Sequence, residues 1–359
     1  MKKVVIADIR SMSTEGNAVG HYFTVAQNYL DLFKDVCEVK IAGGPVYKNK
    51  FEKKDLLLLD YNAESSCSSI ENKRRELCNL RQLFQLCEND VIIFQSSAVS
   101  TAYIGIALWA KSQDVYMVQY NTMSLDSAIK RFIYKTAKNK IKGMICPDDL
   151  IGKEYQIPYI VVTDYIYTGS QKEKTLIPFE TKKYDFGFFG IITKDKGVLE
   201  VAQYLALKNY KVVIAGYPVD AELGEKLKKI CQGKTNIELR LQYLNEEEYI
   251  DGIRNCKYCI LNYSGAYSEH SSGVIYDILF NGTPVVGTNC KALKSVAEFK
   301  AGYVYHNIED IDLESLMDKK IYDEYCHNIL LFKKAQDSYA QQIRSFVLKG
   351  KNHDCKTSI

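Results

Sequence analysis

The sequence predicts an α/β protein made of two doubly wound, Rossmann-like domains that face each other across a cleft. Short apolar strands alternate with amphipathic helices, the alternation stops once near the middle of the chain, and it then starts again. Strands separated by helices of this length form βαβ units in a parallel sheet. We therefore expect an amino-terminal domain at residues 1–165, a second domain at 166–335, and a C-terminal helix and tail at 336–359.

The first half alternates between buried strands and helices with one apolar face. In the first helix, for example, Phe23, Ala26, Leu30 and Phe33 recur at helical spacing. The predicted strands are Val4–Ile9, Val36–Ile41, Asp55–Leu59, Val91–Phe94, Val115–Gln119 and Gly143–Cys146. The predicted helices are His21–Phe33, Glu71–Cys87, Ala98–Ala110 and Ser127–Lys142.

A linker is predicted at Ile157–Pro178, which carries two prolines, a Thr-Gly-Ser turn and a charged run. After it the alternation resumes. The predicted strands are Phe186–Phe189, Lys211–Ala215, Ile237–Leu241, Tyr258–Leu261, Pro284–Val286 and Gly302–Tyr305. The predicted helices are Gly197–Leu207, Ala221–Cys231, Glu246–Asn255, Gly273–Phe280 and a region from Asp312 onward, before a frayed polar tail at Gly350–Ile359.

Composition narrows the class of protein. A chain of 359 residues with 47% hydrophobic and 25% charged residues is typical of a soluble globular protein. A net charge of +3 is too small to indicate nucleic acid binding. The 11 cysteines are scattered, and the single C-x-x-C (Cys256, Cys259) has no second pair, so we expect neither zinc nor a disulfide framework but a reducing cytoplasm. No apolar run approaches the roughly 18–20 residues that span a bilayer.

The segment Tyr267–Gly287 carries the strongest signal. Glu269 is followed eight positions later by Asp277, and Ser271-Ser272-Gly273 lies between them at the start of a helix. Free backbone N–H groups and the positive end of the helix dipole suit a phosphate there. Asp277, about one turn into the helix, is placed to accept hydrogen bonds from a sugar hydroxyl. Glu269 is alternatively a capping acid.

Two further loops follow predicted strands. The loop from Arg10 to His21 contains Gly16, Asn17 and Gly20 but matches neither a dinucleotide nor a nucleoside triphosphate motif, and the alternative is an ordinary loop. His21 either faces the cleft or simply begins the helix. The loop GIITKDKG, from Gly190, places Lys194 and Lys196 at a helix start, where the dipole disfavours cations. An anionic ligand explains them; the alternative is a solvated surface pair.

Together these pieces resemble the nucleotide-sugar-binding domain of the GT-B glycosyltransferases, in particular the retaining family four. The resemblance covers Phe186–Tyr305. Its motifs are G-x(5)-K-G ending at Lys196-Gly197, the strand VVIAG at Val212–Gly216, an E-x(7)-D variant of the E-x(7)-E signature (Glu269, Asp277), and G-x-P-V-V at Gly282–Val286. The amino-terminal half matches more loosely, at Gly16-Asn17 and at Asn121.

The resemblance implies transfer of a sugar from a nucleoside diphosphate sugar, with retention and without a metal. It assigns catalytic roles to Glu269, at the transferred sugar, and to Lys196, at the diphosphate. It implies His21 and Asn121 on the acceptor and sugar side. The donor-binding residues that it implies are Gly16, Asn17, Gly190, Lys194, Ser271, Ser272, Gly273 and Asp277.

Two departures from the family keep other functions open. The family commonly has an Arg where this chain has Ile191, and a Glu where it has Asp277. Both changes are compatible with an altered donor or with weakened catalysis. The alternatives are a non-catalytic GT-B partner protein and a GT-B sugar-nucleotide epimerase, although an epimerase is expected to have more acidic and His residues in its cleft.

The acceptor is indicated only by the helix Ser127–Lys142, which combines an apolar stripe with six cationic side chains. Such a helix can rest on anionic lipid. This suggests a saccharide or lipid-linked saccharide acceptor in surface polysaccharide biosynthesis, and a cytoplasmic protein in peripheral contact with the inner face of the membrane through residues 127–142. The alternative is an ordinary domain helix with a solvated basic face.

Overall fold

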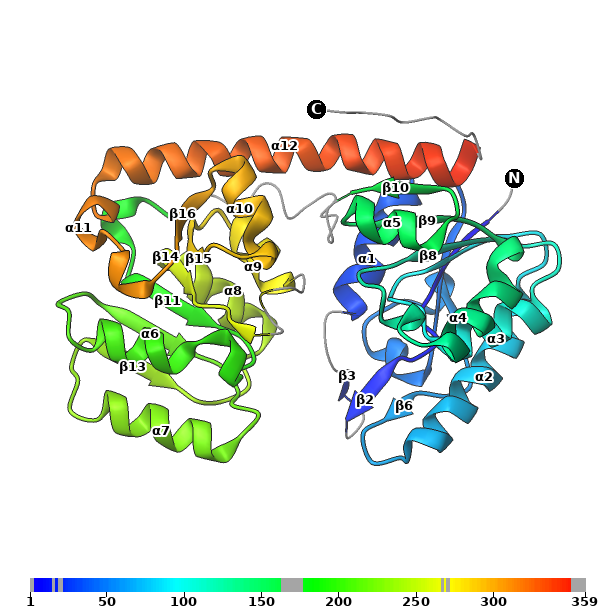
Figure 1. Cartoon of the computed structure of the whole chain (residues 1–359), viewed down its shortest axis with the longest axis horizontal. Coiled ribbons are helices and arrows are strands. Elements are labelled where there is room, and N and C mark those ends of the chain that lie inside the picture. Colours follow the sequence, from blue (N-terminus) through cyan, green and yellow to red (C-terminus); the bar gives the residue numbers. More distant parts are fainter. Residues whose placement is uncertain are drawn as a thin grey trace. The chain divides into compact units, whose positions relative to one another are not determined.

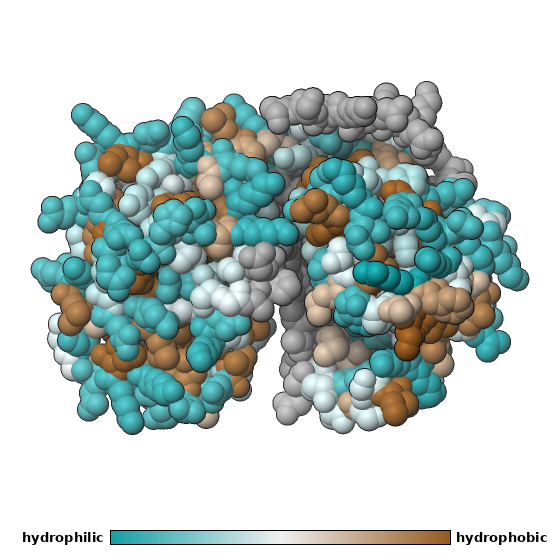
Figure 2. Space-filling view, viewed as in Figure 1, coloured by the Kyte–Doolittle hydropathy of each residue, from teal (hydrophilic) through white to brown (hydrophobic). Residues whose placement is uncertain are grey.

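The computed structural model describes residues 3–14, 17–18, 22–162, 177–265, 268 and 272–349. The chain divides into two compact units. The first comprises Met1–Thr168 together with Gln336–Ile359, and the second comprises Gly169–Ala335. Each unit has a main sheet of parallel strands with helices on both faces (Figure 1). On the face shown in Figure 2, hydrophilic side chains are widespread on both units, with smaller hydrophobic areas between them.

The first unit has a seven-stranded sheet in the order β10-β9-β8-β7-β1-β4-β5. Its strands are β1 (Val4–Ala7), β4 (Val39–Gly43), β5 (Leu56–Leu58), β7 (Val91–Phe94), β8 (Asp114–Val118), β9 (Ile141–Cys146) and β10 (Tyr159–Val161). Val4 pairs with Val39 on one side and with Val91 on the other. The strand order therefore reverses at β1.

Alternate residues of β1 face two separate cores. Val5 and Ala7 pack in the core under α2 (Ser69–Leu86), α3 (Ser100–Trp109) and α4 (Ala128–Ala137). Val4 and Ile6 pack with α1 (Tyr22–Phe33) and with the C-terminal part of α12 (Lys319–Lys349). Because helices cover both faces, the strand sequence is apolar throughout rather than alternating. Helix α5 (Asp149–Tyr155) also belongs to this unit.

The second unit has a six-stranded sheet in the order β13-β12-β11-β14-β15-β16. Its strands are β11 (Tyr184–Phe189), β12 (Val212–Ala215), β13 (Ile237–Arg240), β14 (Cys256–Leu261), β15 (Val285–Thr288) and β16 (Gly302–Tyr305). Its helices are α6 (Val198–Leu205), α7 (Ala221–Cys231), α8 (Glu246–Arg254), α9 (Gly273–Phe280), α10 (Lys294–Phe299), α11 (Leu313–Leu316) and the first part of α12. Phe186 and Phe188 of β11 pack under α6 and α7, and Phe189 packs under α8.

Three sequence predictions of local structure were wrong in part. The helix predicted at Ser127–Lys142 ends at Ala137, and Ile141 and Lys142 belong to β9. Lys140 lies in the intervening 3₁₀ turn η4 (Lys138–Lys140), where its ammonium donates to the carbonyls of Ala107 and Ala110 at the end of α3. Pairing with β8 outweighs the helical pattern there.

The other two errors concern short strands. The predicted linker contains β10, which pairs with β9 at the edge of the sheet. The predicted loop after β1 contains β2 (Met12–Thr14) and β3 (Asn17–Ala18), which form a small sheet with β6 (Ala63–Glu64). Strands of two or three residues are too short to show periodicity in the sequence, and pairing with another strand stabilises them.

Candidate functional site

The second sheet changes direction between β11 and β14. β12 and β13 follow on one side of β11, and β14, β15 and β16 lie on the other. In open parallel sheets, ligands bind beyond the carboxyl ends of the strands at such a point. The loops after β11 and β14 are therefore the first place to expect a ligand.

The loop after β11 is fixed against the loop after β12. The Ile192 N–H donates to the Tyr217 carbonyl at 2.9 Å, and the Val219 N–H donates to the Ile192 carbonyl at 3.1 Å. Gly190 has a φ of +106°, and a Cβ on Gly216 would lie only 1.8 Å from the Gly190 oxygen. Only glycine fits both positions, which keeps the backbone of the β11 loop tight and accessible at Gly190.

Lys196 lies at the end of this loop with its side chain buried. It belongs to the 3₁₀ turn η7 (Lys194–Lys196) and is 4% exposed, whereas Lys194 is exposed. A Cβ placed on Gly190 would lie 3.9 Å from the Lys196 Nζ, so the ammonium lies beside the end of β11. Burial lowers the pKa of Lys196 to about 8. An anion bound here would favour the charged form of the lysine.

Contacts with the loop after β14 hold Lys196 in place. The Ser264 N–H donates to the Asp195 carbonyl at 2.8 Å. Gly197, with a φ of +62°, lies so close to Asn262 that a Cβ would be 2.1 Å from the Asn262 oxygen. The Asn262 side chain in turn accepts a hydrogen bond from the Tyr305 hydroxyl at 3.1 Å. The two loops at the change of strand direction are thus fastened together on either side of Lys196.

Helix α9 begins next to the same loop. A Cβ on Gly190 would lie 3.4 Å from the Val274 Cγ2, so the first turn of α9 contacts the end of β11. Ser272 is the N-cap residue but makes no side-chain cap; its hydroxyl pairs with that of Tyr263 at 2.9 Å. The first backbone N–H groups of α9 are therefore not capped by the side chain that precedes them. One turn into the helix, the Asp277 carboxylate accepts a hydrogen bond from the Tyr249 hydroxyl at 3.1 Å.

This arrangement combines a buried cation, a helix start and a carboxylate within one unit. The Lys196 ammonium and the first turn of α9 both lie beside Gly190, and both favour a negatively charged group. Asp277 presents an acceptor on the same short helix, which suits a hydroxyl-bearing ligand. A phosphorylated, polyhydroxylated compound has both kinds of group.

The structure brings most of the predicted residues of the second half together. Gly190, Lys194, Lys196, Ser272, Gly273 and Asp277 all lie in the β11 loop or in the first turns of α9. Asn17 forms part of β3 in the first unit. The predicted residues Gly16, His21, Glu269 and Ser271 lie outside the described residues.

Asn121 follows β8 in the first unit, where sequence analysis expected it near the sugar. Its side-chain oxygen accepts the Met123 N–H at 3.0 Å, and its carbonyl accepts the Tyr155 hydroxyl at 3.1 Å. These bonds hold the turn that precedes α4. In this structure the Asn121 side chain therefore stabilises a loop.

A buried polar cluster, formed by Asp8, Tyr47 and Gln95 at the change of direction of the first sheet, was not predicted from the sequence. The Gln95 Nε2 donates to the Tyr47 hydroxyl at 2.9 Å, and that hydroxyl donates to the Asp8 carboxylate at 2.7 Å. Burial raises the pKa of Asp8 despite these hydrogen bonds. Asp8 and Gln95 directly follow β1 and β7, and their position after buried strands was the available signal. Tyr249 and Asn262 were also missed; Asn262 likewise directly follows a buried strand, β14.

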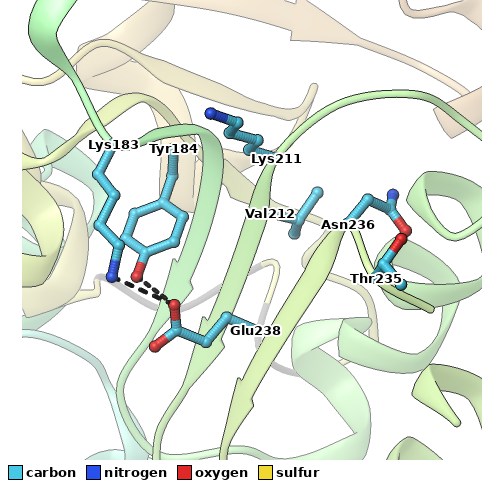
Figure 3. Close-up of a pocket in the computed structure, with 7 residues that line it drawn as sticks. All are labelled: Lys183, Tyr184, Lys211, Val212, Thr235, Asn236 and Glu238. Atoms are coloured by element: carbon cyan, nitrogen blue, oxygen red, sulfur yellow. Dashed lines mark hydrogen bonds and ion pairs between the residues drawn. The ribbon is translucent and has the colours of Figure 1, made fainter. Parts of the chain in front are cut away.

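A hollow of about 280 Å³ lies at the opposite end of the second sheet (Figure 3). Tyr184 and Val212, the first residues of β11 and β12, line it, so it lies at the amino ends of the strands. Lys183 and Tyr184 point to Glu238 and donate to its carboxylate. Hydrogen bonds from Tyr184, Arg240 and Lys183 lower the pKa of Glu238 to about 2. The one carboxylate that lines the hollow, that of Glu238, is already paired with Lys183 and Tyr184, and we assign no ligand to it.

The described residues contain neither a cluster that could hold a metal ion nor a helix that could cross a membrane. No group of three or more His, Cys, Asp or Glu side chains there is arranged to hold a metal ion. No helix in that part of the chain is both long and apolar enough to cross a membrane.

The two parallel α/β units give the chain the GT-B fold, which confirms the predicted fold class. No protein-family model and no curated protein sequence matches the chain. Solved structures match nearly all of it. The Anabaena protein Alr3699/HepE, in complex with UDP and glucose, has a TM-score of 0.65 at 13% identity, over 97% of this chain and all of that chain (100%).

Two more solved structures show the same likeness. AviGT4, a glycosyltransferase involved in avilamycin A biosynthesis, has a TM-score of 0.61 at 15% identity, covering 97% of this chain and 98% of that chain. An α,α-trehalose-phosphate synthase (UDP-forming) from Burkholderia xenovorans, in complex with glucose-6-phosphate, has a TM-score of 0.65 at 9% identity, covering 97% and 100%. At these identities the likeness shows the fold.

Proposed function

We propose that this chain is a glycosyltransferase that moves a sugar from a nucleoside diphosphate sugar to a saccharide or lipid-linked saccharide acceptor, with retention, in surface polysaccharide biosynthesis. The observation that carries the proposal is the buried Lys196 ammonium beside Gly190 and the start of α9. Structures of the same fold are described with UDP or UDP-2-fluoro-glucose bound, which supports a nucleotide sugar as the ligand.

In the proposed reaction, the acceptor oxygen bonds to the anomeric carbon of the donor sugar while the bond from that carbon to the diphosphate oxygen breaks. The nucleoside diphosphate leaves with the electron pair, and the acceptor hydroxyl passes its proton to the departing phosphate oxygen. Lys196 and the backbone N–H groups of α9 stabilise the charge that develops on the leaving group, so no metal is required. Asp277 holds the ribose hydroxyls, and Glu269 contacts the transferred sugar. The remaining donor contacts are Gly16, Asn17, Gly190, Lys194, Ser271, Ser272 and Gly273.

A thermal-shift screen tests the donor site. The wild-type protein is heated with UDP, GDP, ADP or CMP in EDTA, because a ligand that binds only the native state raises its Tm. We expect one nucleotide to raise the Tm, and Lys196→Met to abolish that rise. The control Lys229→Met changes an exposed lysine on α7 of the same unit, outside the proposed site, and should retain the full rise. No shift with any nucleotide, or an equal shift in Lys196→Met, would contradict the proposal.

One observation favours a second candidate, a GT-B protein that binds the nucleotide without turnover. Ile191, at the position where the family commonly has an Arg, is 49% exposed and supplies no charge to the diphosphate. Incubating the protein with nucleotide sugars that carry the matching nucleotide distinguishes an enzyme from a binding protein. Release of free nucleotide, measured by a phosphate-coupled assay or by mass spectrometry, identifies an enzyme. Tight binding of the nucleotide sugar without release identifies a binding protein.

We further propose that the protein is cytoplasmic and that its first unit rests on the anionic inner face of the membrane through α4. Ile129 and Phe132 are 74% and 69% exposed on this helix, and hydrophobic surface is visible over it in Figure 2. Ile133 and Ala137, from the same predicted stripe, pack into the core. Lys135 and Lys142 are exposed nearby, whereas Lys130 and Arg131 also bond to protein neighbours.

Vesicle co-sedimentation tests the membrane contact. Wild-type protein should pellet at low salt with vesicles that contain anionic phosphatidylglycerol. Replacing Ile129 and Phe132 with Asn should weaken this binding at least about tenfold, since two apolar side chains no longer enter the interface. Leu207→Asn, at an equally exposed position of the second unit, serves as the control. Wild-type protein that stays in the supernatant would contradict the proposal.

A further inference from the structure

Tyr249 lies in the second unit on α8 and reaches Asp277 on α9. Its hydroxyl donates to the Asp277 Oδ2 at 3.1 Å. On the basis of the proposed function, we propose that Tyr249 is a positioning residue of the donor site. Its hydroxyl holds the Asp277 carboxylate in the orientation that accepts hydrogen bonds from the ribose hydroxyls of a nucleoside diphosphate.

The backbone of α8 fixes the place of Tyr249. Helix α8 begins with a capping box, in which the Asn245 side chain accepts the Glu248 N–H and the Glu248 side chain accepts the Asn245 N–H. The Tyr249 N–H then donates to the Asn245 carbonyl at 3.0 Å. Such a box sets where the first turn of the helix starts. The side chain of Tyr249 therefore leaves the helix at a defined point.

Packing fixes the ring of Tyr249 as well. It stands edge-on to Phe189, the last residue of β11, with centroids 6.3 Å apart and planes at 85°. Phe189 can pack this close to α8 because Gly252 has no side chain: a Cβ there would lie 2.4 Å from the Phe189 ring. Phe189 directly precedes Gly190. The Tyr249 side chain therefore connects the end of β11, beside which the Lys196 ammonium lies, to Asp277 on α9.

The protonation states of the Tyr249 hydroxyl and the Asp277 carboxylate determine which group donates in this hydrogen bond. Burial and the nearby Asp277 carboxylate raise the pKa of Tyr249 well above its ordinary value, so its hydroxyl stays protonated and acts as the donor. A carboxylate accepts only, and a bond to a charged acceptor is stronger than one between neutral groups. Tyr249 therefore restricts the torsions of the Asp277 side chain without neutralising it.

The shorter side chain at position 277 explains why such a partner is needed. The family signature has Glu at this position, and Asp reaches one methylene less far from the helix. A carboxylate with less reach must point accurately to bind two adjacent hydroxyls, and preorganisation lowers the entropy lost on binding. Tyr249 supplies that preorganisation from a different helix.

Isothermal titration calorimetry tests the inference with UDP, GDP, ADP and inorganic pyrophosphate as probes. Pyrophosphate has the phosphates that Lys196 would bind but no ribose. We expect Tyr249→Phe to weaken binding of the nucleotide that the wild type binds by about fivefold to tenfold, which is within the range for loss of one typical hydrogen bond. Its affinity for pyrophosphate should stay within about twofold, because Asp277 does not touch the phosphates.

A double-mutant cycle makes the test specific to the pair. In an Asp277→Ala background, Tyr249→Phe should change nucleotide affinity less than about twofold, because the residue acts only through the carboxylate. Tyr210→Phe is the matched control, since it removes a tyrosine hydroxyl from the same unit at the amino end of the sheet, where the ring contacts Phe186.

The outcomes separate the inference from the proposed function. If the wild type binds no nucleotide, the proposed function fails and the inference falls with it. If the wild type binds and Tyr249→Phe binds equally well, only the inference is overturned. Equal losses for nucleotide and pyrophosphate, or an undiminished loss in the Asp277→Ala background, would show that Tyr249 supports the fold of the unit rather than the carboxylate.

Discussion

Burial of the Lys196 ammonium costs folding free energy, because water solvates the charge better than the interior does. The lysine is 4% exposed, and its pKa falls to about 8 for this reason. A side chain that weakens the fold in this way is typical of a functional site. At the residue scale, burial of Lys196 therefore serves the proposed donor site and at the same time lowers the stability of the second unit.

Replacing Lys196 with Met should affect stability and nucleotide binding in opposite directions. Met has a similar length and no charge, so Lys196→Met should unfold at a Tm equal to or above that of the wild type at pH 7. The same variant should bind the nucleotide at least about 50-fold more weakly, as expected for loss of a charged hydrogen-bonding partner of a diphosphate. Calorimetric unfolding and titration measure the two effects. A clear fall in Tm would contradict this account of Lys196.

The pH dependence of stability follows from the same pKa. Lys196 has a folded pKa of about 8, below the ordinary value of 10.5, so between these values the unfolded chain binds more protons. The destabilisation is fully present below pH 8, and stability is recovered as the pH rises from 8 toward 10.5. Denaturant unfolding of wild type and Lys196→Met at pH 7 and pH 10 should therefore show their difference in free energy shrinking by roughly 2–3 kcal/mol.

Ligand binding should show the opposite trend with pH. A diphosphate needs the protonated lysine, so wild-type affinity should fall as the pH rises above 8. Titration at pH 7, 8 and 9 measures this, and an affinity independent of pH would contradict it. Lys196→Met, which has no ammonium to lose, supplies the baseline.

Single residues differ in how readily their place in the site can be predicted from the sequence. Gly190, Lys196 and Asp277 lie in motifs with fixed spacing after predicted strands, so their grouping could be predicted. Tyr249 is 28 positions from Asp277 and lies on a different helix. Its role depends on how α8 packs beside α9, and no spacing in the sequence encodes that packing.

At the scale of elements, the loops around Lys196 are fixed by glycines that face other backbone. Gly197 and Gly233 both have positive φ values, +62° and +73°. A Cβ on Gly197 would meet the Asn262 oxygen at 2.1 Å, whereas one on Gly233 would have nothing within 4 Å. Comparing Gly197 with Gly233 therefore distinguishes two free-energy costs of adding a Cβ: the cost of the backbone conformation and the cost of displacing the neighbouring loop.

Alanine substitutions at these two glycines should differ in effect. Gly233→Ala should cost about 1 kcal/mol, the conformational term alone. Gly197→Ala should cost at least about 2–3 kcal/mol, because the β14 loop must also move. It should also weaken nucleotide binding, since Lys196 is the preceding residue. Denaturant unfolding and titration check both effects, and equal costs at the two positions would contradict the proposed contact.

Elements were predictable where their own residues determine them. The strands β1, β7 and β12 are apolar throughout because both of their faces are covered, and the sequence shows this directly. β3 and β10 are too short to show a pattern and are strands only through their pairing with β2 and β9. The helical pattern of 127–142 continued into β9 because the apolar positions at Ile133, Ala137 and Ile141 fit a helix until β8 pairs with the last of them.

At the scale of the whole molecule, α12 joins two cores. Its first part belongs to the second unit, where Phe332 packs against Tyr276, Phe280 and Phe299. From Gln336 onward the helix belongs to the first unit. There Ile343 and Val347 complete the core over β1 and β7, and the Arg344 side chain donates to the Leu32 carbonyl at the end of α1. The C-terminal part of α12 is therefore part of the fold of the first unit.

This connection predicts that two buried positions on one helix stabilise different units. Ile343 and Ile329 are 0% and 1% exposed, so replacing either with Ala leaves a cavity that costs about 2–5 kcal/mol. We expect Ile343→Ala to reduce amide hydrogen-exchange protection in β1, β7 and α1, and Ile329→Ala to reduce it in the second unit. Exchange followed by mass spectrometry resolves the two units by peptide. If Ile343→Ala reduced protection equally in both units, they would unfold as one cooperative body; if it affected only the second, the assignment of α12 to the core of the first would be wrong.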